Sequence, residues 1–212
     1  YGNGTQVLKD GKVVINSPEA VSAFEWYIDL IRKHKVTPPS VATDGYRQIV
    51  EGFGRGVTSM YLHNSGSVEE QKKFVGEANF ATLPIPLGPA KKRATFYFSE
   101  TLTMFKAAKQ KEGAWNFMAW LMDDEPHYNY CKTLGLLPTR QALAERPPYN
   151  GAAYDGFVKS FPFSIVSPYL AYAGWGGKLD SEGVPLVQQA MVGKLSPKEC
   201  LDKLVEILTK NM

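Results

Sequence analysis

The stretch FGRGVTSMYLHNSG, from Phe53 to Gly66, decides how the chain is interpreted. It begins where a helix-like pattern ends, because Gly54 and Gly56 interrupt that pattern. Apolar and polar residues then alternate around Met60, which predicts a short strand. The strand is followed by small polar residues rather than by a tight hairpin back into the core. The residue pattern alone does not explain why a strand would lead into a small, polar tip.

The composition is that of a globular protein. Of 212 residues, 44% are apolar and 21% are charged, and the net charge is only +3. The densest basic cluster, residues 91–93, follows Gly88-Pro89 and is interpreted as a solvated turn, since no aromatic residues alternate with it as in nucleic-acid sites. No apolar run approaches the ~18 residues of a membrane span. The chain opens at Tyr1 without a signal segment, which leaves a processed form or a fragment open.

Hydrophobic periodicity and turn signals predict an α/β protein without internal repeats. Asp10-Gly11 between two apolar runs predicts a hairpin, and Gly135 predicts the end of a helix. Helices are expected over 17–34, 44–53, 68–75, 112–122, 126–134, 152–160, 186–192 and 196–208. Strands are expected over 60–62, 79–89 and 94–105.

The tryptophans and cysteines give expectations about the core. Trp26 and Trp115 lie in periodic apolar runs and are expected to be buried, whereas Trp175 stands among glycines and is expected to present its ring to a partner. Tyr46 is expected to face inward from its helix. The two cysteines, 131 and 200, fit no zinc or CxxC spacing and are expected to be buried thiols, with a disulfide possible only in an oxidising compartment.

Six pieces in sequence order carry a family resemblance: NSPEAVSAFEWYIDLIRKHKVTPP, FGRGVTSMYLHNSGS, LPIPLGP, SETLTMFKAAKQKEGAWNFMAWLMDDE, GLLPTR and GKLSPKECLDKLVEIL. Together they span nearly the whole chain. The sequence resembles the C-terminal portion of a family 1 extracellular solute-binding protein, the substrate receptor of bacterial ABC importers, of the sugar-binding type. Small residues at 64–67, and Phe98-Ser99-Glu100 where relatives frequently carry two glycines and an aromatic residue, depart from the family pattern.

The resemblance implies a type II periplasmic-binding-protein-like fold, mainly its second lobe with a short segment of the first. It places residues 1–100 and 136–212 in the second lobe and residues 101–135 in a segment that crosses to the first. It implies a sugar, polyol or sugar phosphate bound between the lobes, delivery to membrane permease subunits, and no cofactor. It also implies an exported protein that is periplasmic or extracellular, either free or lipid-anchored.

Candidate ligand contacts lie in four places, and each also has a plain structural reading. The polar tip could offer hydrogen bonds, a carboxylate at residue 100 could accept two sugar hydroxyls, and the fork of residue 140 could hold an anion or simply begin the next helix. The expected substrate-binding residues are His63, Asn64, Ser65, Gly66, Ser99, Glu100, Arg140, Tyr172 and Trp175. His127 and Cys131 stand four residues apart on a helix, but no third ligand makes a zinc site.

Two other classes of function remain open from the sequence. A carbohydrate-active enzyme would need two carboxylates across a cleft, and no partner for Glu100 can be named. An interaction domain without a small ligand is the third class. No nucleophile elbow, P-loop or HExxH motif is present. The family resemblance makes a binding protein rather than an enzyme the main prediction.

Overall fold

The computed structural model describes residues 1–212, apart from the side chain of Ala171. Its regular structure is mostly helical, and the helices are short. They are α1 (Pro18–Arg32), α2 (Tyr46–Gly54), α3 (Val68–Val75), α4 (Lys111–Leu121), α5 (Asp124–Leu134), α6 (Gln141–Ala144), α7 (Ala152–Val158), α8 (Trp175–Lys178), α9 (Val184–Met191) and α10 (Pro197–Thr209). The strands are β1 (Leu8–Lys9), β2 (Lys12–Val13), β3 (Thr95–Tyr97) and β4 (Ser164–Val166).

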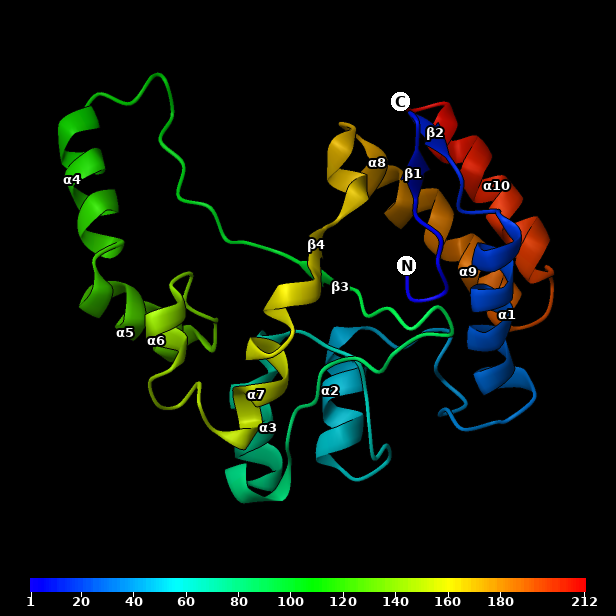
Figure 1. Cartoon of the computed structure of the whole chain (residues 1–212), viewed down its shortest axis with the longest axis horizontal. Coiled ribbons are helices and arrows are strands. Elements are labelled where there is room, and N and C mark those ends of the chain that lie inside the picture. Colours follow the sequence, from blue (N-terminus) through cyan, green and yellow to red (C-terminus); the bar gives the residue numbers. More distant parts are fainter.

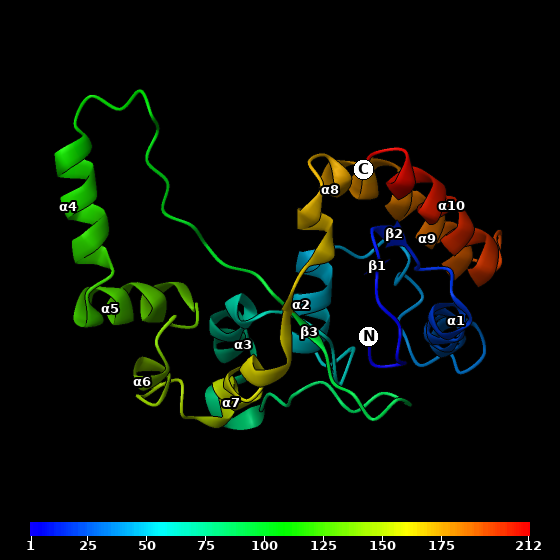
Figure 2. The same cartoon turned by 45° about the horizontal axis from the view of Figure 1, so that its top comes forward.

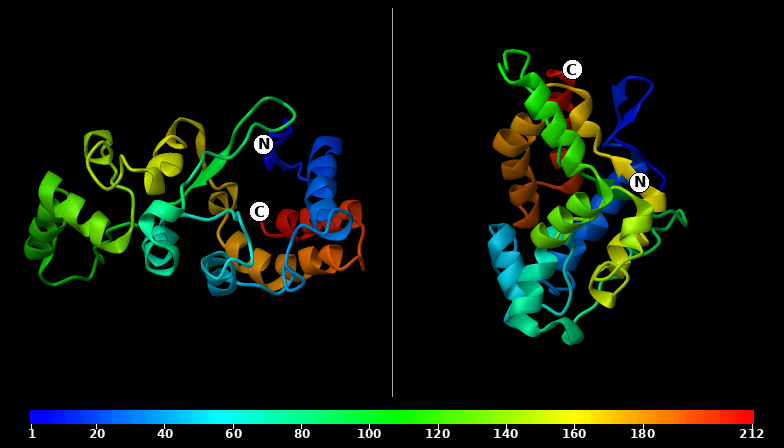
Figure 3. Two further views of the ribbon diagram at one scale, coloured as in Figure 1. Left: turned by 90° about the horizontal axis from the view of Figure 1, so that it is seen from below. Right: turned by 90° about the vertical axis from the view of Figure 1, so that its left-hand side faces the viewer.

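The elements form three groups along the longest axis of the molecule (Figure 1). One end holds α1, α9, α10 and the β1–β2 hairpin, so the beginning and the end of the sequence lie together. The opposite end holds α4, α5 and α6, while α2, α3 and α7 lie between the ends near the crossing of β3 and β4. The end that holds α4, α5 and α6 also stands apart when the molecule is seen from below (Figure 3).

Local sequence signals explain where the helices begin and end. Ser17 Oγ accepts a hydrogen bond from the backbone N–H of Ala20 and caps α1. Ser196 and Glu199 form the predicted capping box of α10, each side chain accepting from the other's backbone N–H at 3.2 and 2.9 Å. Gly135, with φ +70°, ends α5 in the left-handed conformation. These predicted helix ends are confirmed.

The first core lies at the end that holds α1, α9 and α10. Ile28 of α1 packs against Ala190 of α9 and Leu204 of α10, and all three are buried. Trp175 connects the β1–β2 hairpin with α10, because it packs in one cluster with Val13 of β2 and Leu208 of α10. A long-range core of this kind gives α1, α9 and α10 stability that their short lengths could not supply alone.

The second core lies between α3, α5 and α7. It is rich in tyrosine: Tyr128, Tyr149 and Tyr154 are buried, with ring centroids 6.0 and 5.2 Å apart along the series. The Tyr154 hydroxyl donates to the Glu69 carboxylate at 3.0 Å, which satisfies a polar group at the edge of the cluster. This core fixes α3, and therefore fixes the polar turn that precedes it.

The two sheets are both small. β1 and β2 pair antiparallel around Asp10 and Gly11, whose positive φ values of 50° and 72° suit a tight hairpin, as predicted. β3 and β4 pair in parallel over three residues, from Thr95 opposite Ser164 to Tyr97 opposite Val166. The parallel register brings the chain that leaves β3 and the chain that leaves β4 to the same end of the sheet.

The strand predictions were less accurate than the helix predictions. The structure assigns no strand over 57–64 or over 79–89, and only Thr95–Tyr97 of the predicted 94–105 strand is paired. Within the described chain no neighbouring strand pairs with these segments. They therefore lack the hydrogen bonds to a partner strand that would make them part of a sheet. Met60 and Leu62 are accordingly 84% and 77% exposed.

The tryptophan predictions were reversed. Trp26 and Trp115 are 66% and 60% exposed, although both lie in periodic apolar runs. Trp175 is fully buried although glycines surround it in the sequence. Cys131 and Cys200 are buried free thiols in different cores, as the plain reading of the sequence predicted.

Candidate functional site

A hydrogen-bonded polar turn precedes α3. Asn64 Oδ1 accepts a hydrogen bond from the Gly66 N–H at 3.0 Å, and Ser67 Oγ donates to the Asn64 carbonyl at 3.1 Å. The Tyr61 hydroxyl donates to Ser67 Oγ at 3.1 Å and ties the approaching chain to the turn. Ser67 is buried, whereas Asn64 is exposed. These residues form a short 3-10 turn over Ser65–Ser67 rather than the tip of a strand, so the predicted strand before the turn is wrong, and a role in ligand binding stays a prediction.

His63 lies at the base of this turn among aromatic rings. Its ring centroid is 4.4 Å from that of Tyr46 in an edge-on arrangement and 5.6 Å from that of Tyr61. His63 is half-buried, and its Nδ1 has no hydrogen-bond partner among the described residues. Burial lowers the pKa of His63 below its usual range, so the imidazole is mainly neutral at pH 7.

Tyr46 is the residue of this site that sequence reasoning missed. It was predicted to face inward, but it is the first residue of α2 and its side chain is 47% exposed. Its ring forms one wall beside His63 and has a hydroxyl at its tip. The signal that could have found it was its place just after Gly45 at the helix start, where fewer neighbours cover a side chain.

Ser99 and Glu100 follow β3 and are exposed. Glu100 forms no ion pair or hydrogen bond with any described residue, so its carboxylate is available. Phe98 packs against Tyr169 with ring centroids 6.3 Å apart, which joins the chain leaving β3 to the chain leaving β4. The segment after Glu100 then runs away from the middle of the molecule toward α4 (Figure 2).

Trp175 and Tyr172 are placed otherwise than predicted. The Trp175 Nε1 donates to the Leu208 carbonyl at 3.0 Å inside the core, so the prediction of a ring presented to a partner is wrong. Tyr172 is half-buried against Trp175, with ring centroids 4.7 Å apart. The reason is local: Gly174 adopts φ +91° and turns the following indole into the core.

Arg140 has a structural partner. It precedes α6, and its guanidinium binds the Asp124 carboxylate and the Met122 carbonyl at the junction of α4 and α5. Of the two readings that the sequence left open, the one in which Arg140 stands at the start of the next helix is supported. The acidic run 123–125 is exposed and is interpreted as a helix boundary paired with arginines.

His127 and Cys131 also form a structural cluster. His127 Nε2 accepts from the Thr139 backbone N–H at 3.1 Å and lies 3.7 Å from the Cys131 sulfur. Burial lowers the pKa of His127, and Arg140 lowers it further. No group of three or more metal-ligating side chains occurs among the described residues.

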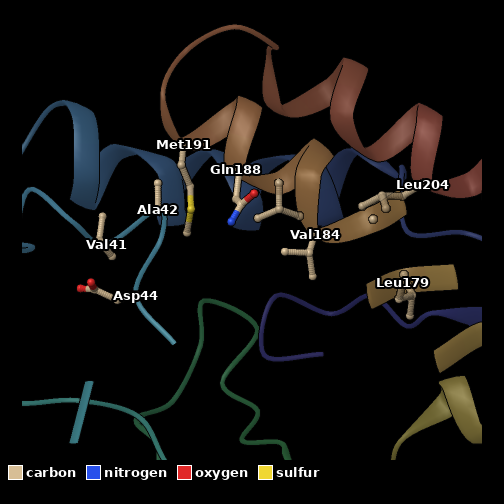
Figure 4. A pocket seen from close by; sticks show the side chains of 10 residues that line it. Val41, Ala42, Asp44, Leu179, Val184, Gln188, Met191 and Leu204 are labelled. Carbon is tan, nitrogen blue, oxygen red and sulfur yellow. The ribbon is translucent and has the colours of Figure 1, made fainter. Parts of the chain in front are cut away.

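A separate, broadly open cavity is lined by none of these residues (Figure 4). It measures about 290 Å³ and is lined by the segment 41–44 on one side and by Leu179, α9 and Leu204 on the other. Asp44 and Gln188 are the polar side chains among its otherwise apolar lining. A sugar needs more hydrogen-bond partners than this, so the polar turn is the better candidate.

Comparison with known proteins identifies the family. Residues 2–153 match the family model of the bacterial extracellular solute-binding proteins, so the chain belongs to that family. The resemblance inferred from the sequence is confirmed. Binding proteins of Brucella abortus (strain 2308) and Brucella suis biovar 1 (strain 1330) are each 25% identical over 177 residues. That alignment covers 82% of this chain and 42% of each relative.

Solved structures confirm the periplasmic-binding-protein-like fold. Maltose-bound Thermotoga maritima MalE3 superposes with a TM-score of 0.80 at 24% identity, covering 100% of this chain and 55% of that one. The GacH receptor of Streptomyces glaucescens, solved unliganded and with acarbose, gives 0.83 at 19% identity, covering 99% and 54%. A Thermotoga lettingae ABC transporter solute-binding protein with bound α-D-tagatose gives 0.81 at 20%, covering 99% and 54%.

The chain spans about half the length of these relatives. Within the described residues, every helix is too short or too polar to cross a membrane.

Proposed function

We propose that this chain supplies one side of a sugar-binding site in the solute receptor of an ABC importer, which passes its ligand to permease subunits in the membrane. Family membership supports the solute-binding role. The sugar is suggested by the ligands of structurally similar proteins, which are maltose, tagatose and acarbose. The receptor would act in the periplasm or at the cell surface, either free or lipid-anchored.

The observation that carries the proposal is the partly exposed polar turn His63–Gly66, with Asn64 exposed, beside the half-exposed ring of Tyr46. Sugars have apolar C–H faces, which pack on aromatic rings, and hydroxyls, which need hydrogen-bond partners. Tyr46 offers the ring and Asn64 offers an exposed amide, while the internal hydrogen bonds of the turn keep it preorganised.

Glu100 favours a neutral ligand over an acidic one. Its free carboxylate can accept two hydroxyl hydrogen bonds, which are stronger than neutral ones. Arg140, the cation considered for an anionic solute, is engaged with Asp124. A neutral sugar or polyol therefore suits the described residues better than a sugar phosphate. Ser65, Gly66 and Ser99 would contribute their backbone and hydroxyl groups at the same site.

Closure of two lobes around the ligand is the expected conformational step. In the proposed arrangement, residues 1–100 and 136–212 belong to the second lobe and residues 101–135 cross to the first. The part of the fold that this chain does not span would then complete the cleft. The 212-residue chain alone is expected to bind weakly, because only one wall of the site is present.

A thermal-shift screen tests the proposal. The 212-residue chain and an extended version that also carries the part of the family fold this chain does not span are each heated with maltose, tagatose, acarbose, a polyol and a sugar phosphate. A ligand that binds only the folded state at 100 times its Kd adds about 2.7 kcal/mol of stability. We expect a neutral sugar to stabilise the extended version.

Variants then locate the site. Tyr46→Ala and Glu100→Gln in the extended version are each expected to weaken sugar binding about 30-fold, or about 2 kcal/mol, in calorimetric titration. Tyr130→Ala on α5 is the matched control, because Tyr130 is exposed but distant in sequence from the polar turn. Unchanged affinity in both site variants, or no stabilisation by any sugar, would contradict the proposal.

A further inference from the structure

Helix α3 carries a buried glutamine at a position where its helical pattern predicts an apolar residue. Val68, Gln71 and Val75 lie three and four residues apart, so they share one face of the helix. Val68 is 2% exposed and Gln71 only 1%. The amide Oε1 of Gln71 has no hydrogen-bond partner among the described residues. Burying an amide costs free energy unless it is hydrogen-bonded, so this glutamine needs an explanation beyond filling space.

The side-chain hydrogen bond of Gln71 joins α3 to α2. Its Nε2 donates to the backbone carbonyl of Val50 at 2.8 Å in a buried position. Val50 lies inside α2, where a carbonyl normally accepts the N–H of the residue four positions later. The carbonyl therefore keeps a partner even without the glutamine. The bond consequently does more to fix where α2 lies against α3 than to stabilise either helix.

A second contact joins the same two helices further along. Gly54, the last residue of α2, lies so close to Phe74 of α3 that a Cβ on the glycine would be 2.6 Å from a ring carbon. The two contacts join residue 50 to residue 71 and then residue 54 to residue 74, so α2 and α3 run in the same direction where they touch. The helices lie side by side in the middle of the molecule (Figure 1). Their relative position is thus set at two points.

The candidate sugar site lies about one helical turn before this hydrogen bond on both helices. On α2, Tyr46 stands four residues before Val50. On the other side, Ser67 is the buried end of the polar turn and stands four residues before Gln71. One helical turn is about 5.4 Å long, so the bond lies close beneath the site. The spacing between the Tyr46 ring and the polar turn therefore depends on how α2 lies on α3.

We propose that Gln71 is a positioning residue of the proposed sugar site. Its hydrogen bond to Val50 holds α2 at the place on α3 where the Tyr46 ring and the polar turn can contact the same ligand. An apolar residue of similar size would keep both helices folded but would let α2 shift along α3, because apolar packing has no direction whereas a hydrogen bond does. The assignment rests on the proposed function, since it concerns the walls of that same site.

NMR of the histidine side chains tests the assignment without any sugar. The imidazole protons of His63 lie beside the rings of Tyr46 and Tyr61, whose ring currents shift their resonances. The variant is Gln71→Met in the 212-residue chain, because methionine is unbranched and adaptable but lacks the N–H donor. Gln188→Met is the matched control, because Gln188 is half-buried on α9, a helix that does not carry the site.

Tyr46→Leu supplies the reference, because it removes the ring itself. In Gln71→Met the His63 resonances are expected to move in the same direction as in Tyr46→Leu, while those of His127 on α5 stay in place. Gln188→Met is expected to move neither. Unmoved His63 resonances with a lowered melting temperature would overturn the assignment, because Gln71 would then only stabilise the chain. An equal shift of His127, or a Gln71→Met chain that no longer folds, would overturn it for the same reason.

Sugar affinity is the second readout, measured in the extended version with maltose, tagatose and acarbose as probes. Gln71→Met is expected to weaken the binding of the sugar that binds about tenfold, the effect of losing one well-placed hydrogen bond, and Gln188→Met is expected to leave it unchanged. An unchanged affinity in Gln71→Met would overturn the assignment. If none of the three sugars binds the unmodified extended version, the proposed function fails, and the His63 resonances still decide whether Gln71 positions Tyr46.

Discussion

The two ends of the molecule show what amphipathic periodicity does and does not decide. Helices α1, α9 and α10 and helices α4 and α5 all carry apolar residues at helical spacing. At the first end, Ile28, Leu204 and Trp175 are buried by one another's elements. At the other end, Trp115 and its aromatic neighbours are exposed. The difference lies in the available neighbours and not in the pattern.

The largest expected effect contrasts two tryptophans. Trp175→Ala should lower the free energy of unfolding by about 3–5 kcal/mol, because it leaves a cavity and removes the hydrogen bond to Leu208. Trp115→Ala in the same 212-residue chain should change it by about 0.5 kcal/mol or less, because the ring is exposed. Urea unfolding of the two variants measures both values. Equal losses would mean that α4 is already packed.

A smaller effect is expected at the start of α10. Ser196→Ala removes the oxygen that accepts the Glu199 N–H and should cost about 1 kcal/mol. Urea unfolding again measures the loss, and Ser181→Ala serves as a control on an exposed serine whose Oγ bonds only to a carbonyl one turn earlier. If Ser196→Ala lowers the free energy of unfolding no more than Ser181→Ala does, the cap of α10 does not stabilise the folded chain.

Acidification should weaken the part of the molecule around α5. Burial, assisted by Arg140, lowers the pKa of His127 in the folded chain, and its Nε2 accepts the Thr139 N–H. The stabilising contribution is therefore complete above the unfolded pKa and is lost as the pH falls through the folded one. The melting temperature should fall between pH 7 and pH 5.

Two variants isolate this effect. His127→Gln, whose amide oxygen can accept the same N–H, should reduce the dependence on pH. His63→Gln should leave most of it in place, although burial also lowers the pKa of His63. An identical pH profile for His127→Gln and the unmodified chain would contradict the assignment to His127.

Much of the fold was predictable from residues that act locally. Ser17, Gly135 and the capping box of Ser196 and Glu199 fixed helix ends, because caps satisfy backbone groups within a few residues. The strands near Met60 and after Asn79 were not correctly predicted, because pairing depends on a neighbour that periodicity does not reveal. The order of the family's motifs supplied the fold class, which the short paired segments alone would not have indicated.

The candidate site was predicted only in part, because local contacts can be recognised in the sequence and long-range contacts cannot. The polar turn at Asn64 is made by contacts within a few residues and was recognisable. Trp175 and Tyr46 were both misplaced, because their exposure depends on long-range contacts: Leu208 covers the first, and nothing covers most of the second. A glycine-rich context indicated a flexible loop, whereas Gly174 instead turns Trp175 into the core.

Amide hydrogen exchange tests the contrast between the two ends most directly. In the 212-residue chain, the amides of α10 should exchange only through global unfolding. Those of α4 should exchange through local opening with a low free-energy cost, because an 11-residue helix packed on one side has little stability of its own. In the extended version that carries the part of the family fold this chain does not span, α4 should gain protection close to that of α10. Equal protection of α4 and α10 in the 212-residue chain would contradict the account, because it would show that α4 needs no further partner.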